Sequence, residues 1–244
     1  MRRPILVTLF LLHILAIAVP ATAMLKEAAM RLPAELATVE RVPVKGRQGW
    51  KLVERVQFGD CDVYEVRRSF TKGGDLRVGR VVFYEGSKRR QTFGFTLAGP
   101  DGAVWHGGAA TNVRRHALDH DGFEIALRDR SGFMARLEPD AAPDDGWTLD
   151  LTETFDRPLK GTLKRGERTI TVTGTNKLAA TPLPLDETTG YVFESGGKPV
   201  AAVEVINNGA VWISSTIDAS DRAPVTAAIA ALLLFEELRK TLPE

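Results

Sequence analysis

The sequence predicts a mainly β fold: an antiparallel β-barrel or strongly curved sheet packed around a hydrophobic C-terminal helix. Two observations lead to this prediction. The stretch from Ala223 to Phe235 is apolar on every side except at Thr226, and it is rich in alanine and leucine, which favour helix. Most of the chain before it consists of short strand-like segments joined by turns. Because a helix without a polar face needs an apolar environment all round, we expect the sheet to curl around it.

The N-terminus has the features of a secretory signal peptide. Two arginines precede an apolar run from Ile5 to Val19, and Ala21 and Ala23 fit the small-residue positions of a cleavage site. We therefore expect residues 1–23 to be removed and the mature protein to be periplasmic or secreted; an uncleaved anchor helix is the alternative. Removal takes two of the 32 basic residues and none of the 31 acidic ones, leaving 30 against 31, so no global charge favours nucleic acid.

The rest of the chain is expected to divide into two parts. Residues 24–41 carry apolar residues at helical spacing with Pro33 among them, which predicts a short, kinked helical lead-in. Residues 42–244 form a single β-rich domain that ends in the buried helix, at about residues 220–241. At roughly 1.5 Å per residue the apolar stretch is too short to cross a bilayer, so we expect no transmembrane span after signal cleavage.

Short strands follow one another from Val42 onward. The clearest are Gln91–Leu97 and Trp147–Thr152, in which apolar and polar or small residues alternate with a period of two. Asn208-Gly209 is the strongest hairpin signal in the chain. Regular strands with tight turns are typical of an antiparallel sandwich or barrel. If the helix fills that barrel, no lipocalin-like cavity for a substrate is expected.

The end of the chain resembles a known superfamily. The last strand reads GAVWISSTI from Gly209, and a D-x-S-D-R-A segment and the apolar helix follow it. This layout is similar to the tubby C-terminal superfamily, which includes LURP-one-related and phospholipid-scramblase-like proteins. The resemblance implies a closed barrel around the C-terminal helix, and some members bind phosphoinositides or other lipids. No lipid-binding motif of that family can be placed residue by residue here, so the resemblance transfers no function.

Motifs of the common catalytic classes are absent from the sequence: there is no G-x-G-x-x-G after a strand, P-loop, G-x-S-x-G or H-E-x-x-H. His116 and His120 lie beside Asp119 and Asp121, but residues four apart in an extended segment are about 13 Å apart. A solvated loop is therefore favoured over a zinc site. His106, in W-H-G-G, could act as an acid or base, although a polar strand-end residue is the simpler interpretation. We expect neither a cofactor nor a metal.

Three other features have structural interpretations. Cys61, the only cysteine, is expected to be a small buried apolar residue rather than a nucleophile or a dimer bridge. The four tryptophans are expected in the core or at its edge. The acidic segment from Glu138 to Gly146 lacks the spacing of a calcium loop and is interpreted as a solvated loop.

Charge supplies one candidate binding surface. Residues 67–90 contain eight basic residues against two acidic ones, whereas residues 138–156 contain seven acids and no base. In one interpretation the two regions neutralise each other or are solvated faces of the protein. In the other, the basic hairpins bind an anionic partner such as a lipid headgroup or an envelope polymer. The candidate binding residues, chosen because they lie near turns, are Arg77, Lys88, Arg89 and Arg90.

The leading hypothesis is an exported, non-enzymatic envelope protein of unknown role that binds a lipid or another anionic ligand. An exported hydrolase or isomerase acting on a small substrate in the barrel mouth is the first alternative. A structural envelope component is the second. Whether the protein is an enzyme stays open, with binding preferred to catalysis.

Overall fold

A computed structural model describes residues 28–47, 54–69, 76–78, 81–83, 92–111, 117–120, 123–126, 132–153, 158–185 and 187–241. Twelve of the strands form one barrel, and their bounds are β1 (Val42–Lys45), β2 (Val56–Phe58), β3 (Cys61–Ser69), β6 (Thr92–Ala98), β7 (Val104–Thr111), β10 (Gly132–Pro139), β11 (Trp147–Glu153), β12 (Leu159–Arg165), β13 (Arg168–Thr175), β14 (Gly190–Ser195), β15 (Lys198–Glu204) and β16 (Ala210–Ile213). All neighbouring pairs are antiparallel, and the order around the barrel is β1-β16-β15-β14-β13-β12-β11-β10-β7-β6-β3-β2, closed by the pairing of β2 with β1.

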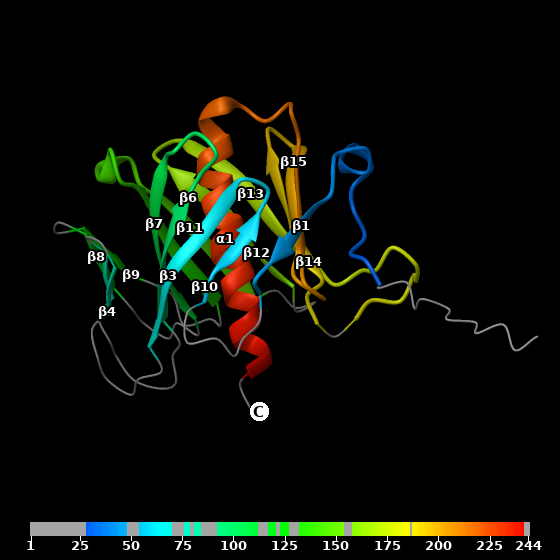
Figure 1. Cartoon of the computed structure of the whole chain (residues 1–244), viewed down its shortest axis with the longest axis horizontal. Helices are drawn as coiled ribbons and strands as arrows, with labels where there is room; N and C mark the ends of the chain where they lie inside the picture. Colours follow the sequence, from blue (N-terminus) through cyan, green and yellow to red (C-terminus); the bar gives the residue numbers. More distant parts are fainter. Residues whose placement is uncertain are drawn as a thin grey trace, which may run out of the picture.

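The C-terminal helix α1 (Ala219–Thr241) runs through the middle of this barrel (Figure 1). Every residue from Val225 to Phe235 is buried, and from Ala227 to Leu234 the exposed fraction is zero. Thr226, the polar exception, donates its hydroxyl hydrogen bond to the carbonyl of Arg222 at 2.8 Å, so burying it leaves no free donor. The predicted barrel around an apolar C-terminal helix is confirmed.

Strand alternation supplies the barrel side of the core. Phe93 and Phe95 in β6 and Phe133 in β10 are buried on the inward face, as the period-two pattern predicted for β6. The ring of Phe133 stacks on that of Phe235 in α1, with centroids 4.4 Å apart. Side chains of strands and helix therefore form one continuous core.

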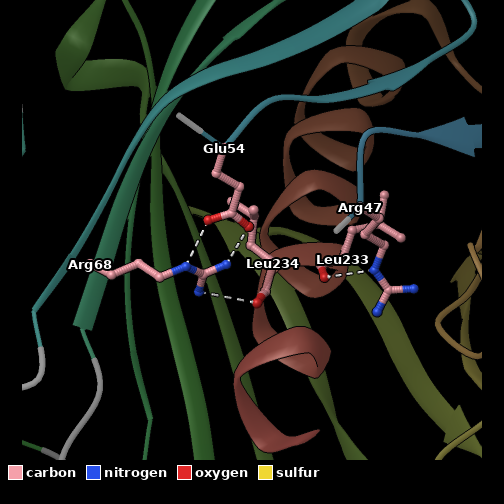
Figure 2. Close-up of polar contacts among 5 residues, drawn as sticks. All are labelled: Arg47, Glu54, Arg68, Leu233 and Leu234. Atoms are coloured by element: carbon pink, nitrogen blue, oxygen red, sulfur yellow. Dashed lines mark hydrogen bonds and ion pairs between the residues drawn. The ribbon is translucent and has the colours of Figure 1, made fainter. Parts of the chain in front are cut away.

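Two arginines bind backbone carbonyls of α1 (Figure 2). The Nε of Arg47 donates to the carbonyl of Leu233 at 3.3 Å, and Nη1 of Arg68 donates to the carbonyl of Leu234 at 3.4 Å. Arg68 also donates from Nε to the carboxylate of Glu54 at 2.7 Å. These contacts connect the helix to the barrel wall, because Arg68 lies in β3 and Arg47 follows β1.

Two connections between barrel strands form a second, four-stranded sheet. The β3–β6 connection supplies β4 (Leu76–Val78) and β5 (Val81–Phe83), and the β7–β10 connection supplies β8 (Ala117–His120) and β9 (Phe123–Ala126). The order is β4-β5-β8-β9, and β4 lies next to β6 and β7. The loop predicted around His116–Asp121 is thus wrong for residues 117–120, which form β8. Its pairing with β5, far away in the chain, could not be inferred from local sequence.

The segment before β1 packs on the outside of the barrel (Figure 1). In the described part of the expected helical lead-in, only a single 3-10 turn, η1 (Ala34–Leu36), is helical. Residues before Pro33 use their backbone N–H groups elsewhere: Met30 donates to the Glu204 carboxylate at 2.7 Å, and Arg31 to the carbonyl of Lys177 at 2.9 Å. Apolar side chains of this segment and of β14–β16 form a second small core: Met30, Leu36, Val192, Ala202, Ala210 and Trp212.

Candidate functional site

A pocket of about 350 Å³ lies at the barrel mouth next to the N-terminal end of α1. Its wall comes from β1, β2, β3, β6, β7 and β16 and from the loops between them. The helix supplies the remaining side. The lining residues are Glu40, Val42, Phe58, Gly59, Asp60, Cys61, Leu97, Gly99, Pro100, Asp101, Ala103, Trp105, Val211, Ile213, Ala219, Arg222, Ala223 and Thr226. The helix therefore occupies the middle of the barrel and leaves a pocket at this mouth, which is not the central cavity of a lipocalin-like barrel.

The pocket exists because the first turns of α1 are narrow on one side. Ala219, Arg222, Ala223 and Thr226 are spaced i, i+3, i+4 and i+7, which places them on one helix face. Two of the four are alanines, and the hydroxyl of Thr226 is turned back to its own helix backbone. Further along α1, larger residues such as Leu233 fill the space to the barrel wall. The described pocket consequently lies beside the N-terminal turns of α1.

The pocket is apolar inside and charged at its edge. Phe58, Leu97 and Trp105 are buried residues of its wall. Glu40, Asp60 and Asp101 are exposed carboxylates in the lining. Such a combination can hold an apolar body while charged groups at the entrance select what is attached to it.

Cys61 lies in this wall and is half-buried. Burial raises the pKa of its thiol to about 11, and the nearby carboxylates of Asp60 and Asp101 act in the same direction. A raised pKa keeps the thiol protonated at neutral pH, so Cys61 is a weak nucleophile. The side chain therefore belongs to the apolar wall, and it can report on access to the pocket.

The pH dependence of Cys61 alkylation tests this environment. We expect the N-ethylmaleimide rate of the folded protein to rise about tenfold for each pH unit up to about pH 10, because only the thiolate reacts. The same residue in urea-unfolded protein should level off near an ordinary cysteine pKa of about 8.5. The rate can be followed by mass spectrometry of intact protein. A folded-state rate that levels off near pH 9 would show that the thiol is not shielded in this way.

The sequence-predicted basic site cannot be placed at side-chain level. Arg77 lies in β4, whose backbone alone is described, and Lys88, Arg89 and Arg90 lie outside the described residues. Another member of the basic stretch, Arg68, points inward to α1 and Glu54 and so does not contribute to an outer surface. The surface formed by the other four stays a prediction.

The acidic segment has exposed carboxylates at Asp140, Asp144 and Asp145, as its interpretation as a solvated loop predicts, but Glu138 is buried. Glu138 lies in β10, is only 3% exposed, and accepts a hydrogen bond from Nε of Arg136 at 3.2 Å. The 3-10 turn η2 (Pro143–Asp145) is indeed open to solvent at Asp144 and Asp145. Glu138 could have been assigned to the preceding strand from the sequence. In a strand it would lie two residues after Arg136 and share a face with it.

His106 has partners that the sequence did not reveal. Its Nδ1 is 3.4 Å from the hydroxyl of Thr96, and its Nε2 is 3.2 Å from Oδ1 of Asp140. The Thr96 hydroxyl donates to Glu65 at 3.0 Å, and Glu65 lies at a register shift in β3 with φ of 52°. A hydroxyl–imidazole–carboxylate series resembles a nucleophilic triad, in which the hydroxyl is accessible to substrate and the carboxylate is buried. Here the exposures are the opposite, because Thr96 is 5% exposed and Asp140 68%. The buried hydroxyl cannot meet a substrate, so this cluster is interpreted as a structural network.

Two further findings limit the chemistry. Among the described residues, no group of three or more His, Cys, Asp and Glu side chains is placed to hold a metal ion. Within the same part of the chain, no helix combines the length and the apolar character needed to span a membrane.

Comparisons of the chain with models of protein families, with curated proteins and with solved structures give no match. The class of molecule is therefore defined by fold and site alone: a closed antiparallel barrel, filled by its own C-terminal helix, with a pocket at one mouth. The resemblance to the tubby C-terminal superfamily stays a prediction.

Proposed function

We propose that this chain is an exported, non-enzymatic binding protein that holds the apolar part of a small amphiphile in the barrel mouth. The observation that carries the proposal is the pocket between the N-terminal face of α1 and the barrel wall. Its volume of about 350 Å³ falls within the range of small-molecule sites, roughly 300–1,000 Å³. Buried side chains such as Phe58 and Trp105 offer it an apolar interior.

Binding is favoured over catalysis by the chemistry of the lining. The described lining includes no histidine, serine or lysine, and its three carboxylates, from Glu40, Asp60 and Asp101, are exposed to solvent. Its one thiol, Cys61, has a pKa raised to about 11, which is opposite to the shift that a nucleophilic cysteine needs. These features favour binding of a ligand over its transformation.

Filling the pocket with a protein side chain tests the proposal. Ala223 lies in the lining, so Ala223→Trp places an indole where the ligand would lie and should weaken binding by about tenfold or more. Binding can be measured with the neutral fluorescent probe N-phenyl-1-naphthylamine, and the filled pocket should also slow alkylation of Cys61.

Ala180→Trp is the matched control, because Ala180 is exposed in the β13–β14 connection and is not part of the pocket. It adds the same side chain to the surface and should leave probe affinity unchanged. Thermal unfolding of both variants checks that they remain folded. Equal probe affinity in the two variants and the wild type would reject the pocket as the binding site.

A further inference from the structure

The charge of the pocket lining is distinctly negative. The lining contains three carboxylates, from Glu40, Asp60 and Asp101, and one guanidinium, from Arg222, so its formal charge is −2. The carboxylates come from separate places in the chain: the segment before β1, the β2–β3 turn and the β6–β7 turn. Barrel closure brings all three to the same mouth, so their charges add there.

The positive groups near the mouth offset this charge only in part. The Nη2 of Arg222 donates to the carbonyl of Ser214 at 3.2 Å, which holds one end of the guanidinium against the protein backbone. The N-terminus of α1 carries a partial positive charge, but Asp218 and Asp221 lie directly at it. Arg168 pairs with Asp221 at 2.7 Å and lies 4.0 Å from Asp218, so one cation is shared between two carboxylates.

The field of the carboxylates extends into the apolar wall. Burial is the largest cause of the raised pKa of Cys61, and Asp60 and Asp101 raise it further because their charges disfavour a thiolate. A ligand carboxylate or phosphate at the same place would meet the same repulsion. Phe58 and Trp105 are also in the lining, and aromatic rings attract cations.

We propose that this pocket selects a cationic amphiphile, with the alkyl or aromatic body inside and an ammonium-type group at the carboxylates of Glu40, Asp60 and Asp101. This inference rests on the proposed function and adds the class of head group to it. It differs in charge from the anionic ligand that the basic stretch predicts.

Three ligands with the same tail test the selectivity: decyltrimethylammonium, decanol and decanoate, each below its micelle-forming concentration. Isothermal titration calorimetry on the mature protein should give about tenfold tighter binding of the cation than of decanol, and weaker binding of decanoate than of either. Because the carboxylates are exposed, added salt should reduce these differences. Protection of Cys61 from alkylation by each ligand shows that binding occurs in this pocket.

The double variant Asp60→Asn/Asp101→Asn removes two charges while keeping side-chain size, which changes the formal charge of the lining from −2 to 0. It should lose the preference for the cation and keep its affinity for decanol. The control, Asp144→Asn/Glu167→Gln, makes the same change in net charge at exposed positions outside the pocket and should keep the preference.

The possible outcomes separate the two proposals. If decanoate binds as tightly as decyltrimethylammonium, or if the Asp60→Asn/Asp101→Asn variant keeps the full preference for the cation, the inferred selectivity is wrong while the pocket remains a binding site. If none of the three ligands binds or protects Cys61, the proposed function itself is rejected, and the selectivity with it.

Discussion

Leu233→Asp is expected to remove most of the stability of the fold. Leu233 has no exposed surface and lies in the part of α1 that the barrel encloses. The substitution places a carboxylate where no water can reach it and removes a buried apolar side chain, which costs several kcal/mol. Domains of this kind are stable by only about 5–15 kcal/mol. Urea unfolding followed by tryptophan fluorescence should show a midpoint far below that of the wild type, or no cooperative transition.

Leu183→Asp is the matched control, because Leu183 is 71% exposed in the connection between β13 and β14. The same chemical change should shift the unfolding midpoint very little there. If Leu233→Asp does not fold at all, Leu233→Ala supplies a measurable version, with an expected loss of about 2–5 kcal/mol. A Leu233→Ala protein as stable as the wild type would show that the barrel does not enclose the helix.

Arg68→Met is expected to have the second largest effect. The side chains of Arg68 and Glu54 are only 17% and 12% exposed, and Arg68 also donates to the carbonyl of Leu234 in α1 (Figure 2). Its guanidinium carbon lies 5.5 Å from the ring centre of Phe93. Removing one partner of such a pair leaves the other charge largely buried, which costs about 3–5 kcal/mol. The loss can be measured by urea unfolding.

A double-mutant cycle assigns this loss to the ion pair. Glu54→Gln/Arg68→Met removes both charges and should be more stable than Arg68→Met alone. Arg55→Met is a control in the same region, because Arg55 is exposed and its pair with Asp62 lies on the surface. Surface pairs contribute little, so this variant should unfold almost as the wild type does. Equal effects of Arg55→Met and Arg68→Met would contradict a special role for the buried pair.

The elements that the sequence predicted well are those encoded by local periodicity. The apolar stretch Ala223–Phe235 had no polar face, and a fully buried helix follows directly from that. Phe93 and Phe95 alternated with polar or small residues, and they are buried on one face of β6. Asn208-Gly209 lies in the β15–β16 connection, as its turn chemistry indicated. Each of these signals lies within a few consecutive residues.

The candidate site was not predictable in the same way. Its lining combines Glu40, Cys61, Asp101 and Arg222, which lie in four widely separated parts of the chain. They meet because β1 pairs with both β16 and β2 and closes the barrel. No pattern in consecutive residues specifies that pairing, so the acidic edge of the pocket could not be seen in a chain whose total charge is nearly neutral.

The sequence by itself therefore determined the fold class: strands by their alternation, and a helix whose apolar surface required a sheet around it. Only the tertiary structure decided what the barrel leaves open and which charges are buried. It paired Arg68 with Glu54, buried Glu138 beside Arg136, and put Asp60 and Asp101 at one mouth. The physical reason is that propensity and periodicity act over a few residues, whereas burial, electrostatics and pockets depend on strand register and closure, which join residues far apart in the chain.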